Sequence, residues 1–224
     1  MNPPWRPGAR VARLRASHSY GFVFLLIAGV FIFTSTAPDS HWADSVLLLL
    51  QTATFVVALY TSGIARADSP VNVVIIVFAV ANAVLLLVFG GTALDALVGI
   101  LSGILTVATI LTVALGIIDQ GEANVQAVTG AICVYILLGL LFVFLYGVIT
   151  ALSSSDFFAQ GTDGTRSLRL YFSFVTLATV GYGDYTAAQE VSRTFAIVEA
   201  LMGQLYLVTV LALLVQRMRG RDQA

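Results

Sequence analysis

Six apolar segments, each long enough to cross a lipid bilayer as a helix, dominate this chain of 224 residues. They cover residues 20–37, 43–65, 71–91, 96–118, 126–150 and 194–216. A helix of about 20 apolar residues spans the hydrocarbon core of a bilayer. The connections between the segments carry Pro, Gly, Asp and Ser residues, which are typical of turns. We therefore expect an all-α membrane protein with six transmembrane helices.

The composition excludes several classes of protein. Hydrophobic residues make up 58% of the chain and charged residues only 10%, which is too apolar for a soluble domain. The single cysteine, Cys133, lies within an apolar segment, so one chain cannot form a disulfide. The sequence has no basic cluster interleaved with aromatic residues, and nucleic acid is not an expected partner. It also has no nucleophile–base pair, metal cluster or phosphate loop, so we do not expect an enzyme. The first apolar segment lacks a following cleavage site and is expected to remain as a helix.

The arginines indicate how the chain crosses the membrane. All 11 basic residues are arginine. Eight of them lie before the first segment, between the second and third, or after the sixth: Arg6, Arg10, Arg13, Arg15, Arg66, Arg217, Arg219 and Arg221. With six spans these positions share one side of the membrane, and the positive-inside rule makes that side cytoplasmic. Both termini are therefore expected in the cytoplasm. The other three arginines are expected on the outer side, paired with nearby acidic residues: Arg166, Arg169 and Arg193 with Asp156, Asp163, Asp184 and Glu190.

A short motif, Thr179-Val180-Gly181-Tyr182-Gly183-Asp184, precedes the last apolar segment. A dehydrated potassium ion needs a cage of oxygens in place of its hydration shell, and successive backbone carbonyls can supply one if they point to the same side. Glycine at every second position permits the left-handed conformation that such an arrangement requires. The Thr179 hydroxyl can add an oxygen at the inner end. Tyr182 is expected to point away from the ion path, toward the aromatic residues Tyr171 and Phe172.

The residues before the motif strengthen its interpretation. Residues 167–178 form an apolar stretch of about three helical turns, too short to span a bilayer. Long apolar segments flank the stretch and the motif on both sides. Together they predict a re-entrant loop, a structure allowed at membrane depth only where protein buries it or where it lines a watery cavity.

Residues 126–216 resemble the bacterial tetrameric pore-loop potassium channels, through Thr176, the motif from Thr179 to Asp184 and, more loosely, Gly203. The resemblance implies a selectivity filter of Thr179, Val180, Gly181, Tyr182 and Gly183, with K⁺ bound at the first four of these residues. It also implies a homotetramer in the bacterial inner membrane, because one chain carries only one filter. No cofactor other than K⁺ is expected, and the partners are further copies of the chain, K⁺ and membrane lipid.

Two positions depart from the family pattern. Ala178 stands where members usually have a threonine, so a hydroxyl is missing just below the filter. Val175 stands where some members have a glutamate bonded to the residue that matches Asp184, so filter inactivation through that pair is not expected. Tyr171, Phe172, Thr176, Asp184 and Glu199 are expected to support the filter.

Two residues of the last apolar segment stand out. Glu199 is ionisable at membrane depth, which costs on the order of 3 kcal/mol and is typical of a functional site. It can form hydrogen bonds behind the filter, pair with Arg193 or Arg169, or be protonated. Gly203 lies in the middle of the segment, where the family often has a gating hinge; the alternative is close helix packing.

The chain divides near residue 122. Residues 1–19 are expected to form a basic cytoplasmic N-terminus, 20–121 a four-helix domain, 122–217 the pore domain and 218–224 a cytoplasmic tail. The segment 96–118 contains no Lys or Arg, so a voltage sensor is not expected there. Polar residues of the four-helix domain, including Gln51, Ser102, Asn72, Asn82 and several threonines, are expected to bond between helices, with a ligand site as the alternative. Asp44 and Asp95 are expected to be solvated.

The sequence thus predicts a potassium-selective channel that is not classically voltage-gated. Two alternatives remain open at this point. One is a cation channel with weak selectivity, and the other is a non-conducting membrane sensor or assembly subunit that keeps the pore fold.

Overall fold

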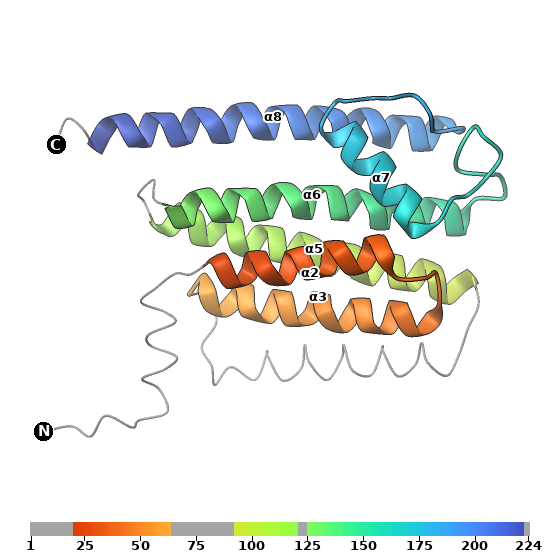
Figure 1. Ribbon diagram of the computed structural model, residues 1–224, viewed down its shortest axis with the longest axis horizontal. Helices are drawn as coiled ribbons and strands as arrows, with labels where there is room; N and C mark the ends of the chain where they lie inside the picture. Colours follow the sequence, from red (N-terminus) through yellow and green to blue (C-terminus); the bar gives the residue numbers. More distant parts are fainter. Residues whose placement is uncertain (1–19, 64–91, 121–124, 222–224) are drawn as a thin grey trace, which may run out of the picture.

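The computed structural model describes residues 20–63, 92–120 and 125–221, and within these ranges the fold is all-α (Figure 1). The helices are α2 (Tyr20–Thr36), α3 (His41–Thr61), α5 (Thr92–Gln120), α6 (Val125–Leu152), α7 (Arg166–Leu177) and α8 (Glu190–Arg221). Five of the expected transmembrane segments correspond to α2, α3, α5, α6 and α8. The third, 71–91, lies outside the described residues, as do the N-terminal arginines, Arg66, Asn72 and Asn82.

Helix boundaries differ from the apolar segments most clearly at α8, which begins at Glu190 rather than near residue 194. Its first turn is polar, and Ser192 bonds both backbone groups of Gln189, donating to the carbonyl at 3.0 Å and accepting from the N–H at 3.2 Å. Hydropathy marks only the part of a helix that lies in lipid, whereas a polar first turn continues the helix into the interface. The expected start was therefore about one turn too late.

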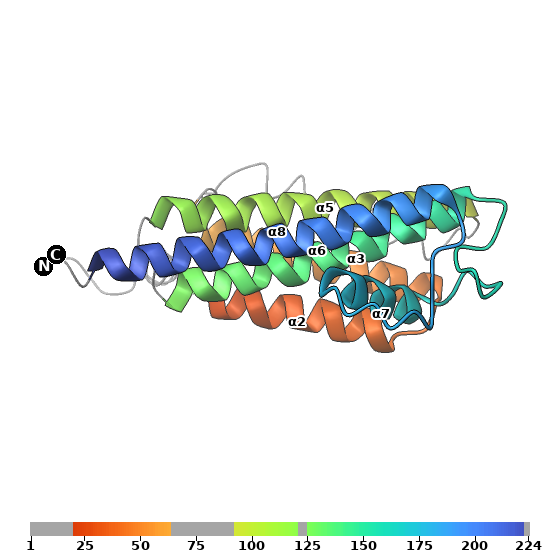
Figure 2. The ribbon, with the colours of Figure 1, turned by 90° about the horizontal axis from the view of Figure 1, so that it is seen from above.

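Among the residues that the structure describes, four helical stretches are long and apolar enough to cross a membrane: His41–Thr61, Ala96–Ile118, Val125–Leu152 and Glu190–Val210. The apolar helix α2 has 17 residues, a length of about 25 Å. The long helices run side by side along one direction in two perpendicular views (Figures 1 and 2). The protein is therefore a multi-pass membrane protein.

The four helices α2, α3, α5 and α6 pack into a bundle whose core contains Tyr20, Val23 and Ile27 of α2 together with Val113 of α5. The threonines of this bundle do not bond between helices as expected. Each hydroxyl donates to the carbonyl four residues earlier in its own helix, which satisfies the hydroxyl without a partner helix. These residues are Thr34, Thr52, Thr54, Thr106, Thr109 and Thr112. Gln51 and Ser102 are buried too, and their side-chain atoms have no hydrogen-bond partner in the described part of the chain.

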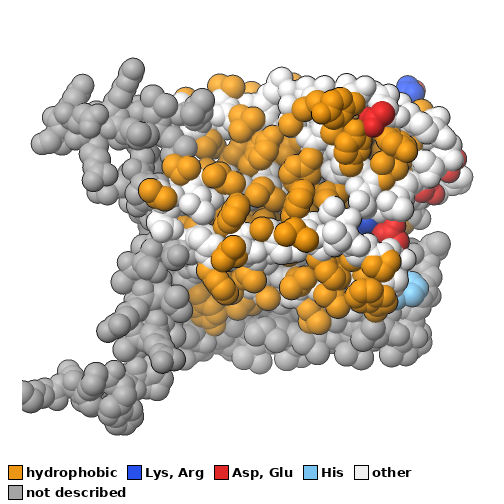
Figure 3. All heavy atoms as spheres, viewed as in Figure 1, with side chains coloured by type: hydrophobic (Ala, Val, Ile, Leu, Met, Phe, Trp, Pro, Cys, Tyr) orange, Lys and Arg blue, Asp and Glu red, His pale blue; other side chains and the backbone are white. Residues whose placement is uncertain are grey.

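Helix α8 packs against α6 and α7 and leaves most of its surface exposed. Only 11% of its membrane-spanning stretch is buried. Large apolar side chains line the exposed surface, namely Val191, Ile197, Val198, Leu201, Leu205, Leu207 and Val208. Hydrophobic side chains cover the middle of the molecule, and charged side chains gather at the end where α7 begins (Figure 3). An apolar face of this extent is covered either by lipid or by another chain.

Candidate functional site

Helix α7 is a short helix that enters the bundle from one end. Its first turn is capped by Thr165, whose side chain accepts a hydrogen bond from the backbone N–H of Leu168 at 3.2 Å. Its 12 residues extend about 18 Å, well short of a bilayer. It packs against α6, α8 and α2. In Figure 1 it lies between α6 and α8, near the loop that follows α6. The chain turns at Ala178 and returns to the same end, so the expected re-entrant loop is present.

The segment after α7 has an alternating backbone. The φ angle is positive at Thr179 (56°), Gly181 (57°) and Gly183 (77°). The prediction of left-handed glycines is therefore confirmed. The left-handed conformation of Thr179 was not expected, since a side chain at positive φ is uncommon and costs energy. A conformation that alternates at every second residue allows successive carbonyls to face one side of the strand.

Backbone N–H groups of the same segment donate hydrogen bonds to carbonyls of α7. The N–H of Thr179 donates to the Thr176 carbonyl at 2.9 Å, and the N–H groups of Val180 and Gly181 donate to the Val175 carbonyl at 2.9 and 3.3 Å. In the described part of the chain, no hydrogen bond has a carbonyl oxygen of residues 179–183 as its acceptor. Residues 179–183 are exposed in the single chain, so these free carbonyls are available to a cation. The segment therefore offers a line of unpaired oxygen ligands.

Aromatic stacking fixes the outer part of this segment. The ring of Tyr182 stacks on that of Tyr171, with centroids 6.4 Å apart and planes inclined by 6°. The Tyr171 hydroxyl donates to Oδ2 of Asp184 at 2.7 Å. Tyr171 thus connects α7 to residues on both sides of Gly183.

Phe172 has different neighbours from those expected. Its ring packs against Tyr146, Phe157 and Phe158, with centroid distances of 5.5, 6.0 and 5.4 Å. It is buried in an aromatic cluster between α6, α7 and the loop at 153–165. Adjacent residues on a helix point in different directions, so Tyr171 and Phe172 cannot both face Tyr182.

Two glutamines that sequence reasoning did not identify hold the chain beyond the motif. The Gln160 side chain donates to the Asp184 carbonyl at 2.9 Å and accepts from the Thr186 N–H at 3.3 Å. Gln189 donates to the Ser153 hydroxyl at 2.7 Å and to the Ser155 carbonyl at 2.8 Å. An amide that both donates and accepts can bond two backbone segments at once. No local pattern identifies such residues, because their partners lie 24 to 36 positions away.

Glu199 lies fully buried behind α7. The hydroxyls of Tyr146 on α6 and Ser173 on α7 both contact its carboxyl group. Of the alternatives left open, hydrogen bonding is therefore present, and within the described residues Glu199 forms no ion pair with Arg193 or Arg169. The two arginines bond backbone carbonyls instead: Arg169 Nη1 donates to Asp163 and Gly164 at 3.2 and 2.9 Å, and Arg193 Nε donates to Ala187 at 2.9 Å.

The contacts of Ser173 determine which hydrogens are present. Its Oγ also lies 2.9 Å from the carbonyl oxygen of Gly139, which can only accept. A serine hydroxyl has one hydrogen, so it cannot donate fully to both Gly139 and Glu199. Both contacts are satisfied when Glu199 is neutral and donates to Ser173, while its other oxygen accepts from Tyr146. A neutral carboxyl also avoids the cost of a buried, unpaired charge.

Two glycines let other elements approach α7 closely. A Cβ at Gly203 would lie 2.2 Å from the carbonyl oxygen of Leu177, the last residue of α7. A Cβ at Gly139 would lie 2.5 Å from the ring of Phe174. Gly203 therefore provides the close packing that was the alternative to a hinge, and the hinge itself stays a prediction.

Arg166 does not pair with the acidic residues expected for it. Its guanidinium forms ion pairs with Asp39, at 3.8 Å, and with Asp44. Its backbone N–H also donates to the Asp39 carboxylate at 3.1 and 3.3 Å. Carboxylates are favoured at a helix N-terminus, and the turn between α2 and α3 lies beside the first turn of α7. Asp44 is thus not solvated as expected, since its side chain is 14% exposed.

Comparisons with known proteins identify the part of the chain that contains this site. Residues 140–220 match a protein family model described as "Ion channel". The match begins within α6 and includes α7, residues 178–189 and nearly all of α8. Neither the curated proteins nor the solved structures gave a match. Residues 140–220 are therefore similar to a pore-loop ion channel domain.

Proposed function

We propose that the protein is a potassium-selective channel, which conducts K⁺ passively across the membrane. The observation that carries this proposal is the backbone of residues 179–183. Its φ angles alternate in sign, the N–H groups of residues 179–181 bond α7, and within the described residues its carbonyls have no hydrogen-bond partner. Four such segments around an axis replace the hydration shell of a dehydrated K⁺.

The channel is proposed to be a homotetramer. One chain supplies one line of carbonyls, so several copies must meet to enclose an ion. The surfaces that such copies would cover are exposed in the single chain: Tyr182 is 70% exposed, and the apolar face of α8 is mostly uncovered. Four copies bring the C-terminal ends of four α7 helices together, and the negative ends of their dipoles favour a cation.

Selectivity for K⁺ over Na⁺ is supported by the side-chain contacts at the outer end of the filter. The stacked rings of Tyr171 and Tyr182, with the hydrogen bond from Tyr171 to Asp184, attach the outer end of the segment to α7. The arginines predict an outward-facing filter with both termini in the cytoplasm. The absence of Lys and Arg from residues 96–118 supports a channel without classical voltage sensing.

The test is the reversal potential of the purified full-length protein in planar bilayers, with KCl on one side and NaCl on the other. We expect reversal near the K⁺ equilibrium potential. Reversal near zero would indicate a weakly selective channel, and no current would indicate a non-conducting subunit. Gly181→Ala should abolish selective current, because its φ of 57° strains any side chain. Gly29→Ala is the matched control, since a Cβ there meets nothing within 4 Å and its φ is not positive.

A further inference from the structure

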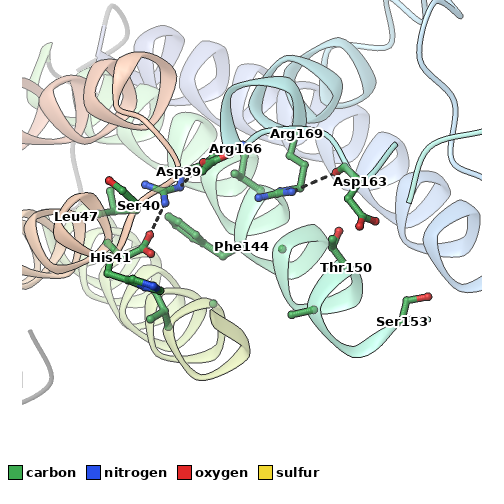
Figure 4. Close-up of a pocket in the computed structure, with 16 residues that line it drawn as sticks. Asp39, Ser40, His41, Leu47, Phe144, Thr150, Ser153, Asp163, Arg166 and Arg169 are labelled. Atoms are coloured by element: carbon green, nitrogen blue, oxygen red, sulfur yellow. Dashed lines mark hydrogen bonds and ion pairs between the residues drawn. The ribbon is translucent and has the colours of Figure 1, made fainter. Parts of the chain in front are cut away.

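A cavity of about 500 Å³ opens at the end of the molecule where α7 begins. It lies between the turn joining α2 to α3, the start of α5, the end of α6 and the first turn of α7. Figure 4 shows Arg166 and Arg169 reaching from α7 toward Asp39 and Asp163, with the ring of Phe144 below them. The cavity is separate from the filter and has no role in the function proposed above.

Two guanidinium groups in the wall of this cavity each have an N–H group that lacks a hydrogen-bond partner in the described part of the chain. The Arg166 side chain is only 10% exposed, and it is paired with Asp39 and Asp44 through other atoms. Its Nη1 is buried without a hydrogen-bond partner in the described part of the chain, as is Nε of Arg169. Leaving such donors unmatched costs free energy, so a ligand with acceptor oxygens is favoured between them.

Carboxylates line the same wall. Asp39, Asp44 and Asp163 all border the cavity, and His41 lies beside them. The Asp39 side chain is 42% exposed and Asp163 is exposed, so both can receive a further donor. A simple anion would meet three carboxylates, and a simple cation would meet two guanidinium groups. A ligand that carries both charges satisfies both sets of groups.

Part of the cavity wall is apolar. Leu47, Val98, Val143 and Phe144 belong to it, together with Gly147. On α5, Leu97 and Ile100, the sequence neighbours of Val98 and Gly99, are exposed apolar side chains. A cavity lined by both charged and apolar residues suits an amphiphile whose polar end lies at the membrane surface.

We propose that this cavity binds a phosphate that carries an amine, the chemistry of phosphoethanolamine. The phosphate oxygens accept from Nη1 of Arg166 and Nε of Arg169, which requires the two guanidinium groups to turn toward the cavity, because both atoms have almost no exposed surface in this structure. The ammonium donates to the carboxylates of Asp39 and Asp163. A phospholipid headgroup and free phosphoethanolamine share this chemistry. The apolar wall takes the first acyl carbons when the source is a lipid.

The test measures ligand retention by native mass spectrometry of the purified full-length protein in detergent. The probes are phosphatidylethanolamine, phosphatidylcholine, phosphatidylglycerol and soluble phosphoethanolamine. We expect phosphatidylethanolamine to bind at least about tenfold more tightly than phosphatidylglycerol, which lacks the ammonium. Phosphatidylcholine should be weaker than phosphatidylethanolamine, because its ammonium has no N–H to donate. Equal or tighter binding of phosphatidylglycerol would overturn the proposal.

Soluble phosphoethanolamine distinguishes the two sources. Binding as tight as that of the lipid supports a free metabolite as the ligand. Binding at least about a hundredfold weaker, with displacement of the lipid at high concentration, supports the headgroup of a membrane lipid. Failure to bind or displace at any concentration contradicts recognition of the headgroup.

A cavity-filling variant locates the site. A Cβ at Gly147 meets nothing within 4 Å, so Gly147→Leu places a side chain in the cavity without removing a charge. It should weaken phosphatidylethanolamine binding at least about tenfold. Gly29→Leu is the matched control, since Gly29 is equally open and does not border the cavity. Wild-type affinity in Gly147→Leu would overturn the proposal.

A second pair of variants covers the case in which Gly147→Leu fails to assemble. Arg169→Gln removes the free Nε donor and should weaken phosphatidylethanolamine binding at least about tenfold. Arg193→Gln is its control, because Arg193 bonds Ala187 away from the cavity. Unchanged affinity in Arg169→Gln would contradict the site. These measurements need no conduction, so their failure leaves the proposed channel function untouched.

Discussion

Replacing Glu199 tests the network that connects α6, α7 and α8 behind the filter. Glu199→Ala leaves the buried hydroxyl of Tyr146 without its acceptor and removes the partner of Ser173. Each unmatched buried polar group costs about 1–3 kcal/mol. The lost side chain also leaves a cavity, since Glu199 has no exposed surface. The sum is a loss of about 3–6 kcal/mol, or a fall in Tm of the order of 6–20 °C.

Glu199→Gln separates a neutral carboxyl from a charged one. The amide carbonyl can accept from Tyr146, and the amide N–H can donate to Ser173, as the neutral acid does. We expect its stability to lie within about 1 kcal/mol of wild type. If Glu199 had to be charged, Glu199→Gln and Glu199→Ala would both remove that charge, and both would lower the stability by similar amounts.

The assay is thermal unfolding of the purified full-length protein in detergent, with the reversal potential measured on the same preparations. Tyr146→Phe in both backgrounds completes a double-mutant cycle, and its effect should shrink once Glu199 is alanine, because the two residues share one contact. Equal destabilisation by Gln and Ala would refute the neutral carboxyl. Wild-type stability of Glu199→Ala would refute the network as a whole.

Three further changes test other contacts of the site. Gly203→Ala should displace the end of α7 and reduce K⁺ over Na⁺ selectivity, at a cost of about 1–3 kcal/mol; altered open probability with unchanged selectivity would favour the hinge instead. Tyr171→Phe keeps the stacked ring but loses the hydrogen bond to Asp184, which should cost about 0.5–1.5 kcal/mol and shift the reversal potential toward zero. Arg166→Gln removes the cation that pairs with Asp44, whose side chain is 14% exposed, and should lower stability by about 1–3 kcal/mol, with partial recovery in Arg166→Gln/Asp44→Asn. Thermal unfolding checks Gly203→Ala and Arg166→Gln. A Tm unchanged by Arg166→Gln would contradict the ion pair.

Hydropathy and spacing predicted the parts of the fold that depend on local sequence. Long apolar runs are sufficient for membrane helices, and the five described segments all became helices. The apolar run before the motif is too short to span a bilayer, which predicted a re-entrant helix, and α7 with its 12 residues is that helix. Glycine at alternate positions predicted the left-handed backbone at Gly181 and Gly183. In each case the physical cause lies within a few residues of the feature.

Long-range partners could not be predicted in this way. The ion pair of Arg166 joins residues 122 positions apart, and the Tyr146–Glu199 contact joins residues 53 apart. Such contacts depend on how each helix is rotated about its axis, and α6 is so uniformly apolar that its sequence does not mark a buried face. The prediction that the threonines bond between helices was wrong for another reason. A threonine hydroxyl in a helix can donate to a backbone carbonyl of its own helix.

Because Asp39 and Asp44 anchor α7, the helices that precede α5 and the part of the chain that contains α7 are not independent of each other. Residues that precede α5 supply the carboxylates that cap and neutralise the first turn of α7. A pore excised from this protein would carry Arg166 without its counter-charges. A chimera that borrows its first helices from another channel would need carboxylates at the corresponding turn. The early helices thus contribute to the pore as a scaffold, independently of any stimulus they detect.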